Sequence, residues 1–256
     1  MDAQQARSPS SGNERPILET KRISKAFGHV QALRDVDLVI YPHEVLALVG
    51  DNGAGKSTLV KILSGDYQPD CGEIWVDGQQ KEFHTIRDAY AAGIATLYQD
   101  LALVGCRDVA DNLYLGRELT QGILVDKRRM LVEAEKMIRG LNVGLPSVHT
   151  KVSLLSGGQR QAVAIGRAMH HGGKILLLDE PTAALGVKES HQILSLVGRL
   201  AKEGPSIVII SHNLTHVFRI ADRIAVLRRG RLVGTRRKEE TEPDEIVKMI
   251  TGADML

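Results

Sequence analysis

Short apolar runs, each followed by glycine-rich or polar residues, recur along this chain and have the length of buried β-strands. The longest occupy residues 45–49, 175–178 and 207–210, and residues 94–98 and 224–227 have the same character. An apolar run this short with turn residues on both sides is typical of a strand covered on both faces. The pattern therefore predicts a buried sheet.

Segments with helical spacing alternate with these strands. In residues 127–141 the apolar side chains fall on one face, at Met130, Leu131, Ala134, Met137, Ile138 and Leu141. Further helices are expected at residues 85–92, 108–115, 157–171, 188–202 and 214–220. Strands that alternate with helices imply a largely parallel sheet between helical layers, so the predicted fold class is α/β.

Two parts of the chain depart from this alternation. Residues 17–24 and 32–40 alternate partly between apolar and polar side chains, and a strand at residues 74–76 ends at Asp77-Gly78, a hairpin signal. These segments predict an antiparallel β subdomain. From about residue 101 the pattern is mostly helical until Gly173.

We therefore expect one domain over residues 16–254. Its core would comprise residues 16–99 and 174–254, with a helical subdomain inserted at about residues 100–173. Residues 1–15 are polar, contain serine, proline and glycine, and lack an apolar segment. They are interpreted as a disordered tail and not as a signal peptide.

Composition and charge narrow the possible functions. The 256 residues are 43% hydrophobic and 25% charged, with a net charge of +2. This balance does not call for a polyanionic partner, so no nucleic acid is expected. Cys71 and Cys106 form no C-x-x-C pair, which argues against a disulfide framework or structural zinc. No apolar stretch approaches the ~20 residues of a membrane span. We expect a cytoplasmic chain that reaches a membrane only through a partner.

A glycine-rich loop between a predicted strand and a predicted helix carries the strongest chemical signal. Its residues fit the pattern G-x-x-x-x-G-K-[ST]: Gly50, Asp51, Asn52, Gly53, Ala54, Gly55, Lys56, Ser57 and Thr58. Glycines let backbone N–H groups converge on a phosphate, and the helix N-terminus favours negative charge. Lys56 can reach the β- and γ-phosphates, and the Ser57 hydroxyl can bind Mg²⁺. The alternative is a glycine-rich turn that matches by chance.

A second loop precedes the helix predicted from residue 157. Leu155 is followed by Ser156, Gly157, Gly158 and Gln159. A serine and two glycines at a helix N-terminus can bind an anion, or Ser156 can simply cap the helix. In a chain with a phosphate loop, this pentapeptide resembles the signature loop of ATP-binding cassette (ABC) ATPases. The resemblance extends over about residues 17–235.

The resemblance implies a P-loop NTPase (RecA-like) core with an antiparallel β subdomain and a helical insertion, binding ATP and Mg²⁺. Asp179 and Glu180 follow an apolar strand and are similar to the family's Walker B acids. Asp179 would hold Mg²⁺ through water, and Glu180 would polarise the attacking water. Gln99 matches the Q-loop glutamine, a second Mg²⁺ ligand. His212 matches the switch histidine and Phe27 the aromatic residue that stacks on adenine. Lys56, Glu180 and His212 would then be the catalytic residues.

One position departs from the family pattern. Where most relatives have an aspartate in the D-loop after the Walker B strand, this chain has Gly186. In the family that loop lies at the dimer interface, so this chain would lack the contacts that the aspartate makes there.

The resemblance also implies partners. Two copies would bind head to tail and sandwich ATP between the phosphate loop of one and residues 156–159 of the other. Transmembrane permease subunits would hold the pair at the inner face of the membrane. A periplasmic sugar-binding protein would be a partner through these subunits. The wider sequence is similar to monosaccharide importer ATPases of the fructose, ribose and xylose systems. The alternatives are a soluble ABC ATPase or an ATP-binding regulator not coupled to transport. A GTPase is disfavoured, because no N-K-x-D motif occurs.

Overall fold

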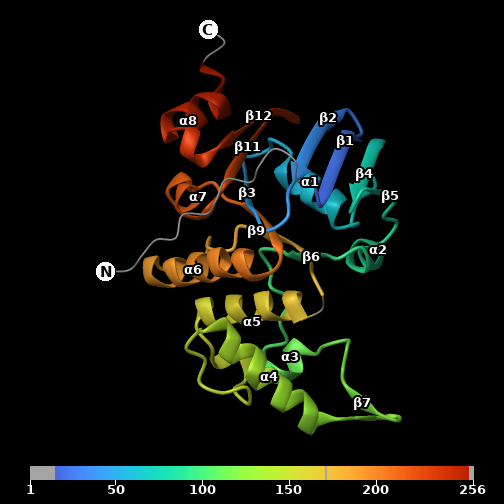
Figure 1. The fold of residues 1–256 in the computed structure, drawn as a ribbon, viewed down its shortest axis with the longest axis vertical. Helices are drawn as coiled ribbons and strands as arrows, with labels where there is room; N and C mark the ends of the chain where they lie inside the picture. The colour runs from blue at the N-terminus through green and yellow to red at the C-terminus, as the bar shows by residue number, and fades with distance from the viewer. Residues whose placement is uncertain (1–14, 171, 254–256) are drawn as a thin grey trace.

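The computed structural model describes residues 15–170 and 172–253. Of the predicted tail, residues 1–14 lie outside the described residues, as does residue 254 of the predicted domain. Figure 1 shows two sheets at one end of the molecule and a group of helices at the other. The helices come from the middle of the sequence, between strands of the larger sheet.

The larger sheet has six strands in the order β12-β11-β3-β10-β9-β6. Its neighbours pair in parallel, except for the antiparallel pair β11 and β12. The strands β3 and β10 are buried throughout, in agreement with their apolar sequences. The strands are β3 (Val45–Val49), β6 (Ile94–Leu97), β9 (Ile175–Asp179), β10 (Ser206–Ile210), β11 (Arg223–Arg228) and β12 (Arg231–Arg237). The predicted parallel sheet is confirmed.

The second sheet is antiparallel, in the order β2-β1-β4-β5. Its strands are β1 (Leu18–Phe27), β2 (Val30–Ile40), β4 (Cys71–Val76) and β5 (Gln79–Lys81). The predicted hairpin turn lies at Asp77 and Gly78, with φ of 51° and 73°. Strand β1 runs three residues further than predicted, because register shifts after Thr20 and Ile23 interrupt its alternation.

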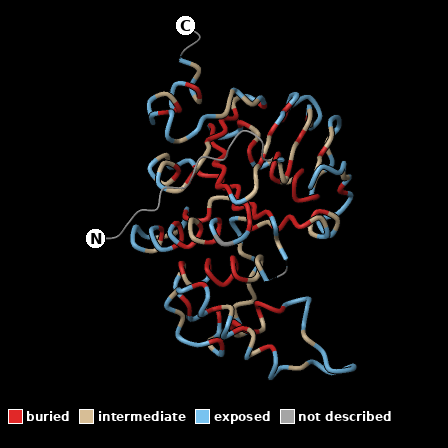
Figure 2. The backbone as a smooth tube through the Cα atoms, in the orientation of Figure 1, coloured by how far each residue is buried: buried red, intermediate tan, exposed pale blue. Residues whose placement is uncertain are grey.

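Helices cover the larger sheet and continue away from it. They are α1 (Lys56–Leu63), α2 (Ile86–Ala91), α3 (Val109–Leu113), α4 (Lys127–Leu141), α5 (Gly157–His170), α6 (Val187–Glu203), α7 (Leu214–Ile220) and α8 (Pro243–Thr251). In Figure 1, α5 lies between α6 and α4, and Figure 2 shows the buried positions concentrated in the sheet and along the inner sides of these helices. The helices predicted in residues 101–173 are confirmed, although α3 is shorter than expected.

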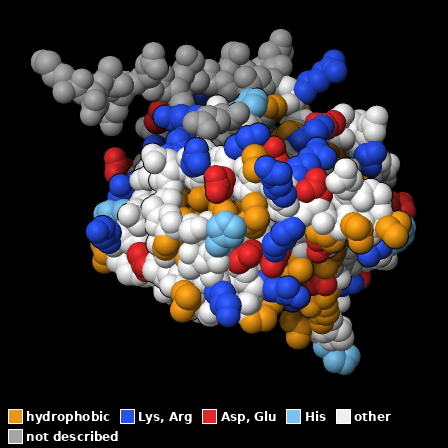
Figure 3. All heavy atoms as spheres, turned by 90° about the horizontal axis from the view of Figure 1, so that it is seen from below, with side chains coloured by type: hydrophobic (Ala, Val, Ile, Leu, Met, Phe, Trp, Pro, Cys, Tyr) orange, Lys and Arg blue, Asp and Glu red, His pale blue; other side chains and the backbone are white. Residues whose placement is uncertain are grey.

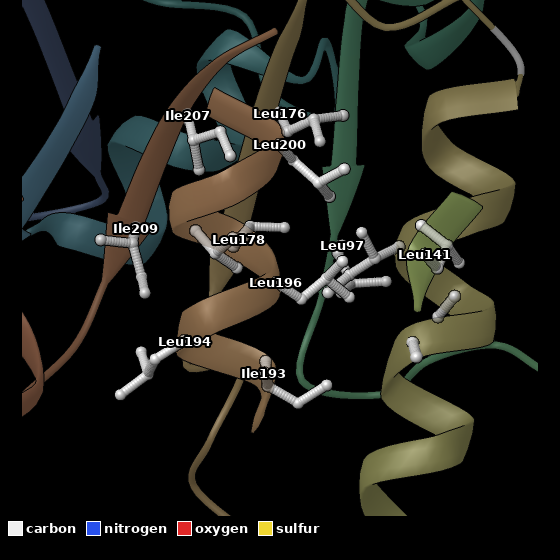
Figure 4. Close-up of a cluster of buried hydrophobic side chains, with 14 of the residues drawn as sticks. Leu97, Leu141, Leu176, Leu178, Ile193, Leu194, Leu196, Leu200, Ile207 and Ile209 are labelled. Carbon is white, nitrogen blue, oxygen red and sulfur yellow. The ribbon is translucent and has the colours of Figure 1, made fainter. Parts of the chain in front are cut away.

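One hydrophobic core continues from the sheet into the helical part. Leu178, Ile207 and Leu196, from β9, β10 and α6, belong to this core, and Figure 4 shows Leu196 beside Leu97, with Leu141 of α4 on the far side. A Cβ built on Gly166 of α5 would lie 2.9 Å from a methyl of Leu141, so this glycine sets the close approach of α4 and α5. The helical part is therefore packed continuously with the sheet that bears the site.

The sequence pattern missed a small hairpin, a strand and a helix. A small hairpin, β7 (Thr120–Gln121) and β8 (Leu124–Val125), interrupts the helical part, and its tip leaves Ile123 almost fully exposed. Strand β12 is rich in arginine, and α8 is short and begins at a proline. None of them has the apolar run or the long periodicity on which the prediction depended. Two short 3-10 turns are also present, η1 (Val152–Leu154) and η2 (Lys238–Glu240).

Figure 3, a view of the helical end, shows lysine and arginine side chains interspersed with acidic ones over the visible face. Within the described residues, the helices are all too short or too polar to span a bilayer.

Candidate nucleotide site

The phosphate loop connects β3 to α1 and is held by close backbone packing. Gly50, Gly53 and Gly55 have φ of 152°, 78° and 105°, all in the region that favours glycine. A Cβ on Gly50 would lie 2.1 Å from the Leu227 carbonyl oxygen, and one on Gly55 would lie 2.5 Å from that of Ala32. The backbones of β11 and β2 therefore pack directly against the loop at these two positions, where only glycine fits.

Lys56 begins α1 with its side chain inside the loop. It is 8% exposed, and its Nζ donates hydrogen bonds to the carbonyls of Gly50 at 2.7 Å and Asp51 at 2.9 Å. Burial lowers the pKa of Lys56, while the charges of Glu180, Asp51 and Asp179 act in the opposite direction. The ammonium group thus lies between the loop carbonyls and the acids at the end of β9.

The other loop residues form an accessible rim around this lysine. Asp51, Asn52 and Gly53 are exposed, and Ala54 is buried beneath them. In the first turn of α1, Ser57 is exposed and Thr58 is half-buried. The loop therefore offers its backbone and the Ser57 hydroxyl to a ligand from solvent.

Two acids lie where β9 ends beside this loop. The pKa of Asp179 is raised, mainly by burial and further by the negative charge of Glu180. The positive charges of Lys56 and Lys61 lower this pKa in part. Glu180 follows in a left-handed conformation, with φ of 49°, and its N–H donates to the Ile210 carbonyl at 3.1 Å. The ends of the parallel strands β9 and β10 thus fix both acids at one edge of the sheet.

His212 meets Glu180 at this edge. Its Nδ1 lies 2.8 Å from Oε1 and 2.7 Å from Oε2 of Glu180. The histidine side chain is 66% exposed and that of the glutamate 24%. The structure therefore brings together two residues that are 32 positions apart in the sequence.

Gln99 lies two residues beyond the end of β6 and is exposed. Because Leu97 pairs with Leu178, the ends of β6 and β9 are adjacent, and Gln99 and Asp179 leave the sheet at the same edge. The preceding residue is anchored, since the Tyr98 hydroxyl lies 2.8 Å from Ser64 Oγ at the end of α1. Hydroxyl, amide and carboxylate oxygens from Ser57, Gln99 and Asp179 are the donor type that fits Mg²⁺.

Phe27 ends β1 with an exposed ring, 43% accessible. Tyr67 packs edge-on against it, with ring centroids 5.3 Å apart. Asp70 fixes the strand end, because its carboxylate accepts from Lys25 Nζ at 2.6 Å and from Ala26 N at 2.7 Å. Sequence reasoning missed Tyr67 and Asp70, which have no motif of their own.

The second loop caps α5. Ser156 N donates to Gln159 Oε1 at 3.0 Å, and Gln159 N donates to Ser156 Oγ at 3.3 Å. This reciprocal pair is a capping box with glutamine in the third position. Gln159 Nε2 also donates to the Gly144 carbonyl at 2.7 Å. Among residues 15–170 and 172–253, no hydrogen bond or ion pair joins residues 156–159 to the phosphate loop.

Gly186 precedes α6 in an extended conformation, with φ of −67° and ψ of 166°. A Cβ there would meet no atom within 4 Å. Its N–H donates to Glu189 Oε2 at 3.4 Å. The glycine at this position is therefore not required by the local backbone.

Comparison with protein families gives a match to the ABC transporter model over residues 33–183, which include the phosphate loop, residues 156–159 and both acids. The chain belongs to the ABC transporter family. The structure of an ABC transporter's ATP-binding cassette in its ADP conformation superposes with a TM-score of 0.81 at 28% identity, covering 93% of this chain and 99% of the other. A dimeric cassette structure bound to ADP and Pi gives 0.72 at 25% identity, covering 86% and 98%.

Curated relatives of this ABC family member are sugar import proteins by name. The xylose/arabinose import ATP-binding protein XylG of Sulfolobus acidocaldarius is 45% identical, covering 92% of this chain and 94% of its own. The fructose import ATP-binding protein FrcA of Rhizobium meliloti is 42% identical, covering 94% and 95%. The ribose import ATP-binding protein RbsA 2 of Escherichia coli O157:H7 is 44% identical over 94% of this chain but 47% of its own, so the chain spans about half of that relative.

Proposed function

We propose that this ABC ATPase supplies the energy for a membrane importer of monosaccharides. One observation carries the chemical part: Lys56, Asp179, Glu180 and His212 meet at the edge of the sheet beside the phosphate loop. The names of the xylose/arabinose, fructose and ribose relatives support the substrate class. Which of these sugars is carried depends on the permease and binding protein that the chain would serve.

Each side chain would have a distinct role in hydrolysis. Lys56 would bind the β- and γ-phosphates, and Phe27, supported by Tyr67, would stack on the adenine. The Glu180 carboxylate would orient and polarise the attacking water, and His212 would hold that carboxylate in place through Nδ1. Mg²⁺, held by Ser57, Gln99 and Asp179, would neutralise charge on the phosphate oxygens.

A second copy would complete the site. Within the described residues, no hydrogen bond or ion pair joins residues 156–159 to the chain's own phosphate loop, and their N–H groups at the start of α5 suit an anion. A head-to-tail pair would place them against the γ-phosphate bound by the partner. The dimeric cassette structure supports such a pair. Permease subunits would hold the pair at the inner face of the membrane. A periplasmic sugar-binding protein would be a partner through these subunits.

The test of this function is reconstitution. The chain would be combined with its candidate permease and binding protein in proteoliposomes, and uptake of labelled xylose, ribose, fructose and a control amino acid would be compared with ATP consumption. ATP-dependent uptake of one sugar supports the proposal. If no sugar stimulates ATP hydrolysis and the amino acid is taken up instead, the monosaccharide substrate class is rejected. The assignment as an ATPase would still stand.

A further inference from the structure

Glu189, in the first turn of α6, lies against the two glycines that open α5. A Cβ built on Gly158 would be 3.2 Å from the Cβ of Glu189, and one built on Gly157 would be 3.8 Å from its Oε2. The same Oε2 accepts from Gly186 N at 3.4 Å. One half-buried carboxylate therefore lies between the loop at residues 156–159 and the loop that precedes α6.

The donors around this carboxylate come from the second loop and from Gly186. A hydrogen bond with the Ser156 side chain is the largest cause that lowers the pKa of Glu189, and the backbone N–H groups of Gly186 and Gly158 contribute further. The charge of Arg160 acts in the same direction. Glu189 is therefore an internal anion at the N-terminus of α5.

These donors cannot serve two anions at once. A serine hydroxyl has one proton, and a backbone amide has one as well. The hydroxyl oxygen of Ser156 already accepts a hydrogen bond from Gln159 N. The hydroxyl proton is therefore what Ser156 can donate to an anion. While the Glu189 carboxylate lies against the loop at residues 156–159, it occupies the place from which a phosphate would reach the Ser156 hydroxyl and the Gly158 amide.

We propose that Glu189 competes with ATP for the loop at residues 156–159. In the single chain, the Glu189 carboxylate occupies this loop. It must leave the loop when a second copy presents the γ-phosphate of its bound ATP. This proposal rests on the proposed function, because the ATP-sandwich pair supplies the competing phosphate. Glu189 also holds the loop at Gly186, so release of the carboxylate would free both loops in one event. The ATP concentration needed for pairing would then depend on this residue.

The conservative variant Glu189→Gln separates charge from shape. It keeps an acceptor oxygen but loses the negative charge, which weakens the charge-assisted hydrogen bonds and the repulsion of phosphate. The exposed Glu135 on α4, which pairs with Arg139 at 3.2 Å, supplies a matched control as Glu135→Gln. Thermal melting and circular dichroism establish that each variant is folded.

The first measurement uses the single chain without nucleotide. Amide hydrogen exchange at Gly158 and Gly186 is expected to be faster in Glu189→Gln and faster still in Glu189→Ala, with Glu135→Gln unchanged. Unchanged exchange in folded Glu189→Ala would overturn the internal contact, whatever the fate of the proposed function.

The second measurement is the dimer Kd in Mg²⁺ and ATP, read by analytical ultracentrifugation in the hydrolysis-deficient Glu180→Gln background. Adding Glu189→Gln is expected to lower this Kd by about fivefold, the scale of replacing a charged hydrogen-bond partner by a neutral one. An unchanged or raised Kd in a parent that pairs would overturn the competition. A parent that does not pair, with exchange at Gly158 accelerated by the Glu189 variants, would instead overturn the ATP-sandwich pair and with it the release step.

Discussion

His212 Nδ1 lies 2.8 Å from Glu180 Oε1, and this contact joins the ends of β10 and β9 at the edge of the phosphate loop. The glutamate backbone is held by its own hydrogen bond to Ile210, so the histidine is left to fix the carboxylate itself. The pair thus couples the orientation of the proposed water-activating group to a largely exposed ring.

Replacement of His212 by alanine should therefore lower kcat more than it raises the KM for ATP. A misoriented catalytic group costs on the order of 10²-fold in rate, whereas ATP binding depends on the loop. The measurement is steady-state ATPase activity over a range of ATP concentrations. The exposed His149 supplies the control as His149→Ala, which should leave both parameters unchanged. A His212 variant with normal kcat would remove the positioning role.

The two glycines Gly50 and Gly53 should respond differently to alanine. Both have positive φ, but a Cβ on Gly50 would lie 2.1 Å from the Leu227 carbonyl, whereas one on Gly53 would meet nothing within 4 Å. Gly50→Ala should therefore lower the melting temperature markedly, because the loop and β11 must separate. Gly53→Ala should show only the backbone strain, about 1–2 kcal/mol. Equal melting temperatures for the two variants would contradict the packing described here.

Asp179 should show a conflict between stability and activity. Its pKa is raised by burial and by Glu180, so at neutral pH its ionised form costs stability, and the cost is lost as the pH falls below the folded-state pKa. Asp179→Asn should therefore melt at a higher temperature than the parent at pH 7, and this advantage should disappear toward pH 4. The same variant should lose Mg²⁺-dependent hydrolysis. A variant less stable than the parent at pH 7 would show that the carboxylate is favourably paired.

Gly186→Asp tests the departure from the family pattern. The position is extended and open, and aspartate is favoured at a helix N-cap, so the variant should fold and melt within a few degrees of the parent. If the native loop weakens the interface between copies, the variant should hydrolyse ATP faster in the purified state. Unchanged hydrolysis would mean that the aspartate has no role in this chain.

Local sequence predicted the parts of the site that depend on neighbouring residues. The phosphate loop, the capped start of α5 and the acids after β9 each follow from a short segment and its flanking elements. The resemblance to the family marked both Glu180 and His212 as catalytic residues, and the structure brings them together.

The parts that were missed depend on packing between distant segments. Tyr67 supports Phe27 only because the end of α1 lies beside the end of β1, and Glu189 reaches Gly158 only because α6 packs on α5. Strand β12 is predicted by neither periodicity nor hydrophobicity, since its pairing with β11 accounts for its conformation. Such contacts have no signal in a single sequence.

Mg²⁺-dependent ATP hydrolysis by the purified chain, measured beside Glu180→Gln with the oligomeric state read in ATP, decides whether Glu180 activates the attacking water. We expect hydrolysis by the parent, a loss of at least about 10²-fold in the variant, and an ATP-bound dimer trapped by the variant. Normal hydrolysis in Glu180→Gln would contradict the assignment of Glu180 and the chemistry built on its contact with His212.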